Sequence, residues 1–320
     1  MKATDYRKVM VERFWDYQKQ HFPVWEDYFE RGKGSDGRPP VFLKETADLN
    51  VLMEHGVSDS RRKTLLNEIP RNDRHRWFRS MSSSQALAQS LFGNLKLYDR
   101  LDLLSDLTDE FGEPIFGKVI PKSDSFKLEY AVDYLGEPRR TSLDALIDGN
   151  YRVAIECKLT EQEVGQCSRP KLKKNDPNYE QYCNGTYSIQ KDRKSRCSLS
   201  EIGVKYWNYI PRVFEWRDDI NLDPCPVCRN YQLVRNVLSI CVTGDNQVSL
   251  DKGHVVLLYD ERNPSFNPGG AGCQAYEQTR DALNEPRLLR RCSWQQITCR
   301  IRSVGSLSWL MRALEEKYGI

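Results

Sequence analysis

Long apolar segments, histidines and an excess of charge of either sign are all scarce in this 320-residue sequence. No apolar run approaches the roughly 20 residues of a membrane-spanning helix, and the first 60 residues lack the pattern of a secretory signal. We therefore expect a cytoplasmic protein without a membrane segment. The four histidines are scattered and do not support a His-based site, and the formal charge of +3 neither indicates nor excludes a nucleic-acid partner.

Cysteine is absent from the first 156 residues, and all ten cysteines lie between Cys157 and Cys299. The composition, with 39% hydrophobic and 29% charged residues, is typical of a folded globular protein rather than a disordered one. In a reducing cytosol, clustered cysteines are more often metal ligands or buried apolar residues than disulfides. The uneven distribution therefore distinguishes the cysteine-rich part of the chain as a separate feature to explain.

Hydrophobic periodicity predicts an α/β protein in which a helix and three strands precede a long insertion, a second helix and a further strand. Residues 1–80 are expected to form an N-terminal helical extension, and residues 81–320 the main domain, with the insertion at about 161–230. The helical spacing is found over 6–29 with a break at Pro23, and over 46–55, 82–101 and 231–242. Strand patterns are found over 126–134, 142–147, 151–160 and 254–260.

Charged residues interrupt the third predicted strand. Alternation places Glu156 and Lys158 on one face of this strand and apolar residues on the other. The preceding strand carries Asp144, and the short connection between the two strands predicts a hairpin. An even register, such as Ile147 opposite Tyr151, brings Asp144 onto the same face, diagonal to Glu156.

These three residues favour metal-assisted hydrolysis of a phosphodiester. Two carboxylates on one face can hold Mg²⁺ or Mn²⁺ through oxygen ligands, and a neighbouring lysine can orient or deprotonate water and stabilise charge on a phosphate. The alternative is a purely structural ion pair between Glu156 and Lys158, because charges in a buried strand are costly unless they are paired.

The order of Asp144 and Glu156-Cys157-Lys158, with a helix before and a helix and strand after, resembles the PD-(D/E)XK nuclease superfamily, the restriction-endonuclease-like fold. The resemblance implies a mixed central sheet flanked by helices and cleavage of DNA, less often RNA, with Mg²⁺ or Mn²⁺. It also implies that Asp144 and Glu156 are metal ligands, that the Cys157 carbonyl adds a ligand, and that Lys158 is the catalytic lysine. A group of bacterial restriction endonucleases of this superfamily is similar in the strings SSSQALAQSLFGNL, AIECKLTE, YWNYIP, YQLVRN, HVVLLYDERNP and RRCSWQ.

The two helices depart from the superfamily pattern. Many members carry a metal-binding glutamate on the first helix, where this sequence offers only Gln85 and Gln89. An amide is a weaker ligand, so we expect Gln85 to bind a metal-bound water or the substrate, and we count Gln85 and Gln232 among the candidate catalytic residues. On the later helix, Gln232 and Asn236 lie four residues apart, which resembles the Gln-x-x-x-Tyr element of some members with asparagine in place of tyrosine.

Five cysteines lie in the long insertion, which needs its own organisation because connections of this length are uncommon in compact domains. Cys225 and Cys228 have the spacing of a zinc knuckle, although their partners do not repeat it. Structural Zn²⁺ is one hypothesis, an iron–sulfur cluster is a second, and reduced core cysteines are a third. Cys241, Cys292 and Cys299 are expected in the core. The candidate ligands are Cys167, Cys183, Cys197, Cys225 and Cys228.

Positive charge is concentrated at the start of this insertion. Residues 165–200 contain eight lysines and arginines against three acidic residues, a local charge of +5 that exceeds that of the whole chain. Such a patch beside a catalytic strand favours contact with nucleic-acid phosphates. The basic residues are Arg169, Lys171, Lys173, Lys174, Lys191, Arg193, Lys194 and Arg196.

The sequence therefore favours a metal-dependent nuclease, most simply a DNA endonuclease that acts in bacterial defence. A second hypothesis is a non-cleaving nucleic-acid-binding or interaction module that keeps the nuclease fold, because the helix glutamate is missing. A third is a structural protein with a zinc-held partner surface. A homodimer is compatible with each, since many such endonucleases pair their active sites.

Overall fold

A five-stranded mixed sheet lies at the centre of the protein. The computed structural model describes residues 2–31, 37–117, 122–138, 141–167, 183, 185–187 and 197–320. The strands lie side by side in chain order, with antiparallel β1–β2 and β2–β3 pairs followed by parallel β3–β4 and β4–β5 pairs. The strands are β1 (Phe126–Val132), β2 (Thr141–Ile147), β3 (Arg152–Cys157), β4 (Gly253–Tyr259) and β5 (Leu289–Ser293).

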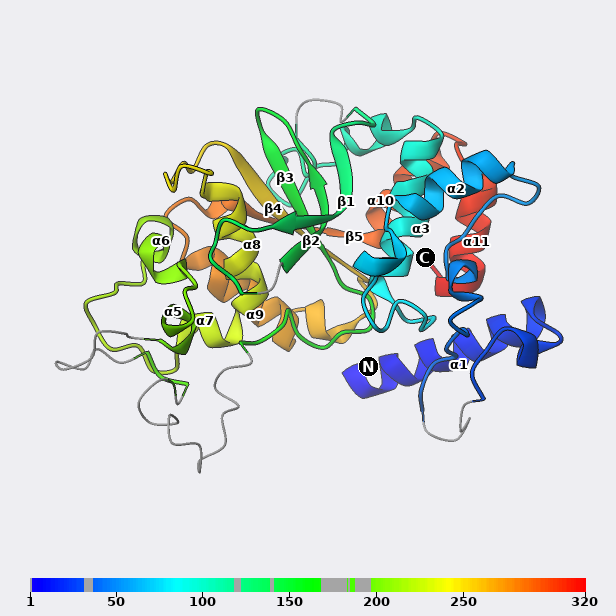
Figure 1. Cartoon of the computed structure of the whole chain (residues 1–320), viewed down its shortest axis with the longest axis horizontal. Helices are drawn as coiled ribbons and strands as arrows, with labels where there is room; N and C mark the ends of the chain where they lie inside the picture. Colours follow the sequence, from blue (N-terminus) through cyan, green and yellow to red (C-terminus); the bar gives the residue numbers. More distant parts are fainter. Residues whose placement is uncertain are drawn as a thin grey trace.

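Helices cover both faces of this sheet, which confirms the expected α/β class with a flanked mixed sheet (Figure 1). One group comprises α1 (Ala3–His21), α2 (Asp59–Asn67), α3 (Ser84–Leu97), α10 (Trp294–Ser303) and α11 (Ser308–Tyr318). The other group comprises α5 (Ser198–Glu201), α6 (Tyr206–Val213), α7 (Pro226–Arg229), α8 (Tyr231–Cys241) and α9 (Ala271–Asp281). No helix in the described ranges is both long enough and apolar enough to cross a membrane.

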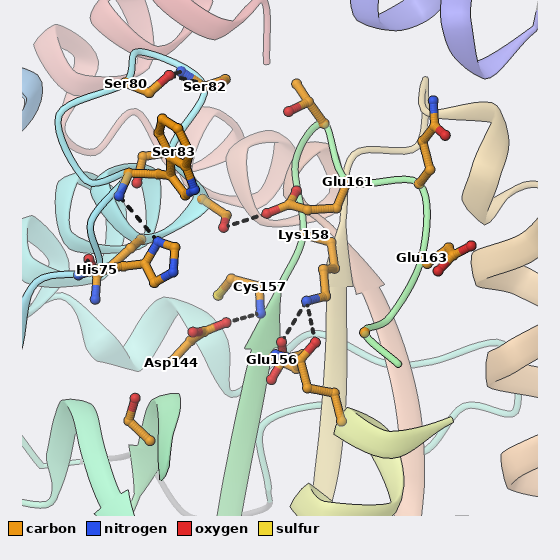
Figure 2. A pocket seen from close by; sticks show the side chains of 18 of the residues that line it. His75, Ser80, Ser82, Ser83, Asp144, Glu156, Cys157, Lys158, Glu161 and Glu163 are labelled. Carbon is orange, nitrogen blue, oxygen red and sulfur yellow. Dashed lines mark hydrogen bonds and ion pairs between the residues drawn. The ribbon is translucent and has the colours of Figure 1, made fainter. Parts of the chain in front are cut away.

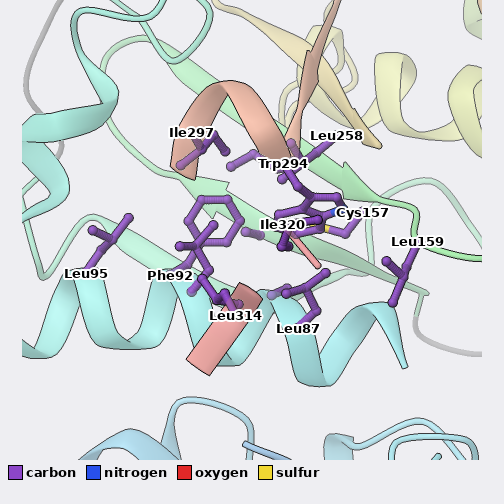
Figure 3. Packing of buried hydrophobic residues seen from close by; sticks show 14 of the residues in the cluster. Leu87, Phe92, Leu95, Cys157, Leu159, Leu258, Trp294, Ile297, Leu314 and Ile320 are labelled. Carbon is purple, nitrogen blue, oxygen red and sulfur yellow. The ribbon is translucent and has the colours of Figure 1, made fainter. Parts of the chain in front are cut away.

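Two hydrophobic cores lie on opposite faces of the sheet. In the first core, Phe92 of α3, Trp294 of α10 and Leu314 of α11 pack against Cys157 and Leu258 of the sheet (Figure 3). The second core is formed by the other sheet face with α6, α8 and α9. Alternation along β3 explains the division, because successive side chains point to opposite faces. Because alternate apolar residues of β3 fill the first core, Glu156 and Lys158 point to the opposite face of the sheet.

The three predicted strands of the hairpin region are confirmed, but the predicted register is not. Residue numbers in the β2–β3 pairs sum to an even value, as expected, yet Ile147 lies opposite Val153 rather than Tyr151. The connection is thus longer by two residues than the sequence suggested. The expected helix over 46–55 is wrong: only a 3₁₀ turn forms at Ala47–Asn50, and the buried Asn50 side chain donates to the carbonyls of Phe78 and Ser80, which ties this turn to the segment before α3.

The N-terminal residues share the first core with the sheet. Tyr6, Met10 and Phe14 of α1 are buried in the same cluster as Leu87 and Ile155. The Tyr6 hydroxyl also donates to the carbonyl of Leu159, directly after β3 (3.2 Å). Part of the segment that the sequence suggested as an extension is therefore packed against the strand that carries the charged residues.

Candidate active site

The candidate site lies where β2 separates from β3. The last pair of the ladder is Ala145 with Ile155, and beyond it the Asp144 carboxylate accepts a hydrogen bond from the backbone N–H of Cys157 (2.6 Å). A side chain thus takes the place of a ladder hydrogen bond. Figure 2 shows Asp144 and Glu156 facing the same space, with Lys158 beside them. The structure therefore brings together the three residues that the sequence singled out.

Glu156 and Lys158 form a buried ion pair with an N–O distance of 2.7 Å. Only 1% of Glu156 and 6% of Lys158 is exposed, so the pair is largely removed from water. Burial favours the neutral carboxyl of Glu156, but Lys158 and Arg235 outweigh it and lower its pKa. Burial likewise favours a neutral lysine, but Glu156, Glu161 and Asp144 outweigh it and raise the pKa of Lys158. Both groups are held in their charged forms, so Lys158 acts as a hydrogen-bond donor rather than a base in this state.

Helix α8 fixes the heads of these two side chains. Gln232 accepts a hydrogen bond from the Lys158 ammonium (2.9 Å), and Asn236 donates to the second carboxylate oxygen of Glu156 (2.7 Å). The guanidinium of Arg235 lies 3.8 Å from the same oxygen. Gln232 and Asn236, the two amides that resemble the Gln-x-x-x-Tyr element, thus both contact the charged pair. A catalytic role for Gln232 stays a prediction.

Asp144 lies in a more negatively charged environment than Glu156. Burial and the neighbouring charges of Glu156 and Glu129 raise its pKa well above the ordinary value, against the opposing effects of Lys158 and the Cys157 N–H. The Cys157 side chain points into the first core. Only the backbone of Cys157 can therefore serve the site.

A third carboxylate, Glu129 of β1, was missed by the sequence analysis. It lies between the pairs Leu128–Ala145 and Tyr130–Leu143, and therefore beside Asp144. Its φ of 49° is left-handed, and burial raises its pKa despite hydrogen bonds from Ser142 and Gln85. Glu129 is one of only two acidic residues in the first predicted strand. The argument from strand pairing and alternation that was used for β2 and β3 could have identified it if it had been applied to the first two strands as well.

Gln85 lies at the edge of the same site and has a bracing role. Its side-chain oxygen accepts a hydrogen bond from the backbone N–H of His75 (2.9 Å), and its amide donates to the carbonyl of Asp73 (3.4 Å). Together with its contact to Glu129, this links α3 to the loop before it and to β1. Gln85 does not hydrogen-bond Asp144 or Glu156 in the described part of the chain.

These residues open into a cavity of about 1050 Å³. Its inner end is lined by Glu129, Asp144, Glu156 and Lys158, and its outer part by residues of the N-terminal segment and the start of α3. Glu161 joins the two parts, because it accepts hydrogen bonds from the Leu159 N–H and the Ser84 hydroxyl. We call Glu129, Asp144 and Glu156 the acidic row. Because it lines this cavity together with Lys158, the acidic row is open to a large substrate.

The carboxylate oxygens of the acidic row are the kind of ligand that a hard divalent cation prefers. Glu129, Asp144 and Glu156 lie together with the cations Lys158 and Arg235, and burial together with the repulsion by Glu156 and Glu129 raises the pKa of Asp144. A divalent cation relieves this repulsion, and Mg²⁺ is bound in proteins through one or two carboxylates together with water and substrate oxygens. Within the described ranges no group of three or more His, Cys, Asp or Glu side chains is arranged to hold a metal ion. Asp144 and Glu156 would therefore be completed by non-side-chain ligands such as the Cys157 carbonyl.

Among the residues that the structure describes, the cysteines of the insertion do not form such a group either. Cys167, Cys197 and Cys225 are buried, while Cys183 and Cys228 are partly exposed. The Cys167 N–H donates to the Cys228 carbonyl (2.8 Å), so the backbone brings distant parts of the insertion together. The zinc or iron–sulfur site stays a prediction.

Two other predictions about the insertion and the cysteines have separate outcomes. Cys241 and Cys292 are buried as expected, but Cys299 is exposed because it lies on the outer side of α10. The basic residues expected to contact nucleic acid lie outside the described residues. They are Arg169, Lys171, Lys173, Lys174, Lys191, Arg193, Lys194 and Arg196.

A mixed sheet flanked by helices, with clustered carboxylates and a lysine at the end of adjacent strands, is compatible with the core of a nuclease. Comparison with family models agrees with this class. The chain belongs to the REase-ARP family, described as restriction endonuclease associating with ARP, whose model matches residues 31–319. Searches of curated proteins and of solved structures each return no significant match. The family membership supports a restriction-endonuclease-like protein.

Proposed function

We propose that the protein is a metal-dependent nuclease of the PD-(D/E)XK type that hydrolyses phosphodiester bonds, most simply a DNA endonuclease of bacterial defence. The observation that carries this proposal is the buried Glu156–Lys158 pair beside Asp144 at the floor of a large cavity. A structural ion pair would not need an open cavity or two further carboxylates. The restriction-endonuclease description of the family supports the same reaction class.

Asp144 and Glu156 would hold Mg²⁺ or Mn²⁺, with the Cys157 carbonyl as a further oxygen ligand. When bound, the cation polarises the scissile phosphate and lowers the pKa of water. The Lys158 ammonium donates a hydrogen bond to the phosphate oxygen on which negative charge develops. Removal of one such donor typically lowers the rate by about 10²–10³-fold. Gln232 keeps the ammonium in place, and Asn236 keeps the Glu156 carboxylate from rotating.

Glu129 extends the acidic row on the side of Asp144 opposite to Glu156. Its carboxylate accepts a hydrogen bond from the Ser142 hydroxyl (2.6 Å), which fixes its orientation. A carboxylate at this position attracts the cation and can accept a hydrogen bond from attacking water. Glu129 thereby supplies the acidic group that the first helix lacks.

The test is cleavage of plasmid, linear and single-stranded DNA by purified protein with Mg²⁺, Mn²⁺ or EDTA. Asp144→Asn and Lys158→Met should each abolish most cleavage without unfolding the protein. Asp148→Asn and Lys127→Met are matched controls, because these residues form an ion pair of the same length (2.7 Å) at the other end of β2, outside the cavity. Cleavage that survives Asp144→Asn, or binding of DNA without cleavage under every metal, would refute the nuclease assignment and favour a non-cleaving binding module.

A further inference from the structure

The outer wall of the cavity differs in chemistry from its acidic floor. Arg7, Arg38 and Trp77, all from the first 80 residues, line this wall. Trp77 is 55% exposed, which makes it one of the most exposed large apolar side chains among the described residues. Arg7 and Arg38 are exposed too, and neither forms an ion pair with a residue of the described ranges. We call these three residues the outer wall.

Backbone pairing holds the outer wall in place. Val41 forms an antiparallel bridge with Ser80, and the Met81 N–H donates to the carbonyl of Pro40 (3.0 Å). The indole N–H of Trp15 donates to the carbonyl of Arg38 (2.9 Å), which anchors the other end of this segment to α1. The segments that carry Arg38 and Trp77 therefore lie side by side in a defined arrangement.

A separate set of contacts places Arg7 near the end of β3. Its neighbour Tyr6 donates to the Leu159 carbonyl after β3 and to the Asp260 carboxylate (2.9 Å). Tyr6 is 2% exposed, so the start of α1 is fixed against the strand end rather than lying freely on the surface. The position of Arg7 on the cavity wall follows from this buried contact.

Trp77 has the features of a stacking platform. The guanidinium of Arg76 lies over its ring, 5.1 Å from the ring centroid, and the His75 ring nitrogen accepts a hydrogen bond from the Trp77 backbone N–H (3.3 Å). Gln85 in turn holds the His75 backbone. A large exposed indole on a braced loop, in the lining of a cavity that also holds Arg7, Arg38 and the carboxylates, can stack on a base through the ring face that Arg76 does not cover.

We infer that the outer wall binds an unpaired DNA nucleotide next to the phosphate at the acidic row, so that the site prefers DNA with a single-stranded or extruded nucleotide. This inference rests on the proposed function. The faces of bases inside a continuous duplex are covered by their neighbours, so an indole can stack only on a base that has left the stack. Arg7 and Arg38 supply the phosphate contacts that the carboxylates of the floor cannot make.

Binding of DNA by Asp144→Asn protein tests the inference without interference from cleavage. The probes are a fully paired two-strand duplex, the same duplex with one unpaired nucleotide in its middle, and a single strand. Adding Trp77→Ala should weaken binding of the single strand and of the duplex with the unpaired nucleotide by about 5- to 150-fold, the range for loss of one base stack, and should change binding of the fully paired duplex by less than about twofold. Trp77→Phe should restore part of the affinity. The matched control is Phe111→Ala, since Phe111 is 60% exposed but does not line the cavity.

Salt dependence tests the arginines separately. Arg38→Gln should reduce the slope of log affinity against log salt by about 1, whereas Arg287→Gln, an exposed arginine outside the cavity, should leave it unchanged. Equal effects of Trp77→Ala on all three probes, or no effect, would overturn the inference. Failure of the nuclease proposal shows instead as the absence of cleavage by the unsubstituted protein, whatever the binding results.

Discussion

The left-handed backbone at Glu129 predicts that one substitution will raise stability and lower activity together. Upstream of Glu129, Phe126 and Leu128 pack in the first core, whereas Tyr130 and Val132 contact the second. The strand thus changes the face that it buries at the acidic residue. Non-glycine residues rarely adopt φ values such as 49°, and such strain is found at functional sites where it re-aims a side chain. Glu129→Gly should release it.

The size of the effect follows from the backbone and the contacts. A left-handed φ destabilises a residue with a Cβ atom by about 1–2 kcal/mol, and glycine avoids this cost. Glycine in a strand in turn lowers stability by about 0.5–1 kcal/mol, because it has greater freedom in the unfolded chain. The Ser142 hydroxyl and the Gln85 amide lose an acceptor, but Ser142 is partly exposed, so water can replace the carboxylate, and the Gln85 amide keeps its bond to the Asp73 carbonyl. Removal of Glu129 also removes its repulsion of Asp144. The free energy of unfolding should therefore rise by about 0.5–1 kcal/mol.

Urea unfolding in EDTA measures this change, and plasmid cleavage in Mg²⁺ measures the loss of function, for which we expect about 10- to 100-fold. Glu129→Gln separates the two effects, since it removes the charge but keeps the strained backbone. Asn246→Gly is the control outside the cavity: it relieves a left-handed φ of 62° in an exposed turn, also removes the acceptor of hydrogen bonds from Tyr209 and Lys205, and should keep full activity. A Glu129→Gly protein that is less stable by 1 kcal/mol or more and cleaves at the original rate would refute this reasoning.

Two further predictions concern buried polar groups. Asn236→Ala leaves one oxygen of the Glu156 carboxylate without its donor, so it should lower the free energy of unfolding by about 1.5–3 kcal/mol and weaken Mn²⁺ binding, as measured by urea unfolding and calorimetry. Unchanged values for both would show that Asn236 does not hold the carboxylate. Burial and Arg290 lower the pKa of His254 to about 3. As the pH falls, the imidazole is therefore protonated in the unfolded chain before it is protonated in the folded protein. The free energy of unfolding should then fall between about pH 6.5 and pH 3, by up to about 5 kcal/mol. Urea unfolding at pH 7.5 and 5 measures the loss, and His254→Asn should flatten this dependence; an equally steep loss in that variant would assign it to other groups.

Strand alternation placed Glu156 and Lys158 on one face, and the expected even register added Asp144 to them; both hold because two cores fill opposite faces of the sheet. The exact register was not predictable in the same way. A shift of two residues keeps every side chain on its face, so the hydrophobic pattern cannot distinguish Ile147–Val153 from Ile147–Tyr151.

Other parts of the site depend on contacts that no local pattern records. Glu129 sits at a left-handed residue in its strand, so simple alternation does not give its direction. Trp77 lies in an irregular segment whose position depends on hydrogen bonds to chain far away, such as those made by Asn50. The parallel strand β5 is short and includes Arg290 and Arg291, so its sequence does not read as a buried strand.

The geometry at the end of β3 depends on both layers of helices at once. The backbone of Lys158 is held from the first-core side, where the Trp294 indole donates to its carbonyl (2.9 Å), while its ammonium is held from the second-core side by Gln232. Leu159 is held likewise by Tyr6 and Asn263. Because backbone and side chain are anchored to different helices, a repacking of either core moves the ammonium relative to the carboxylates. Precise placement of such groups is what electrostatic catalysis requires, which explains why this strand end is tied to helices from both ends of the chain.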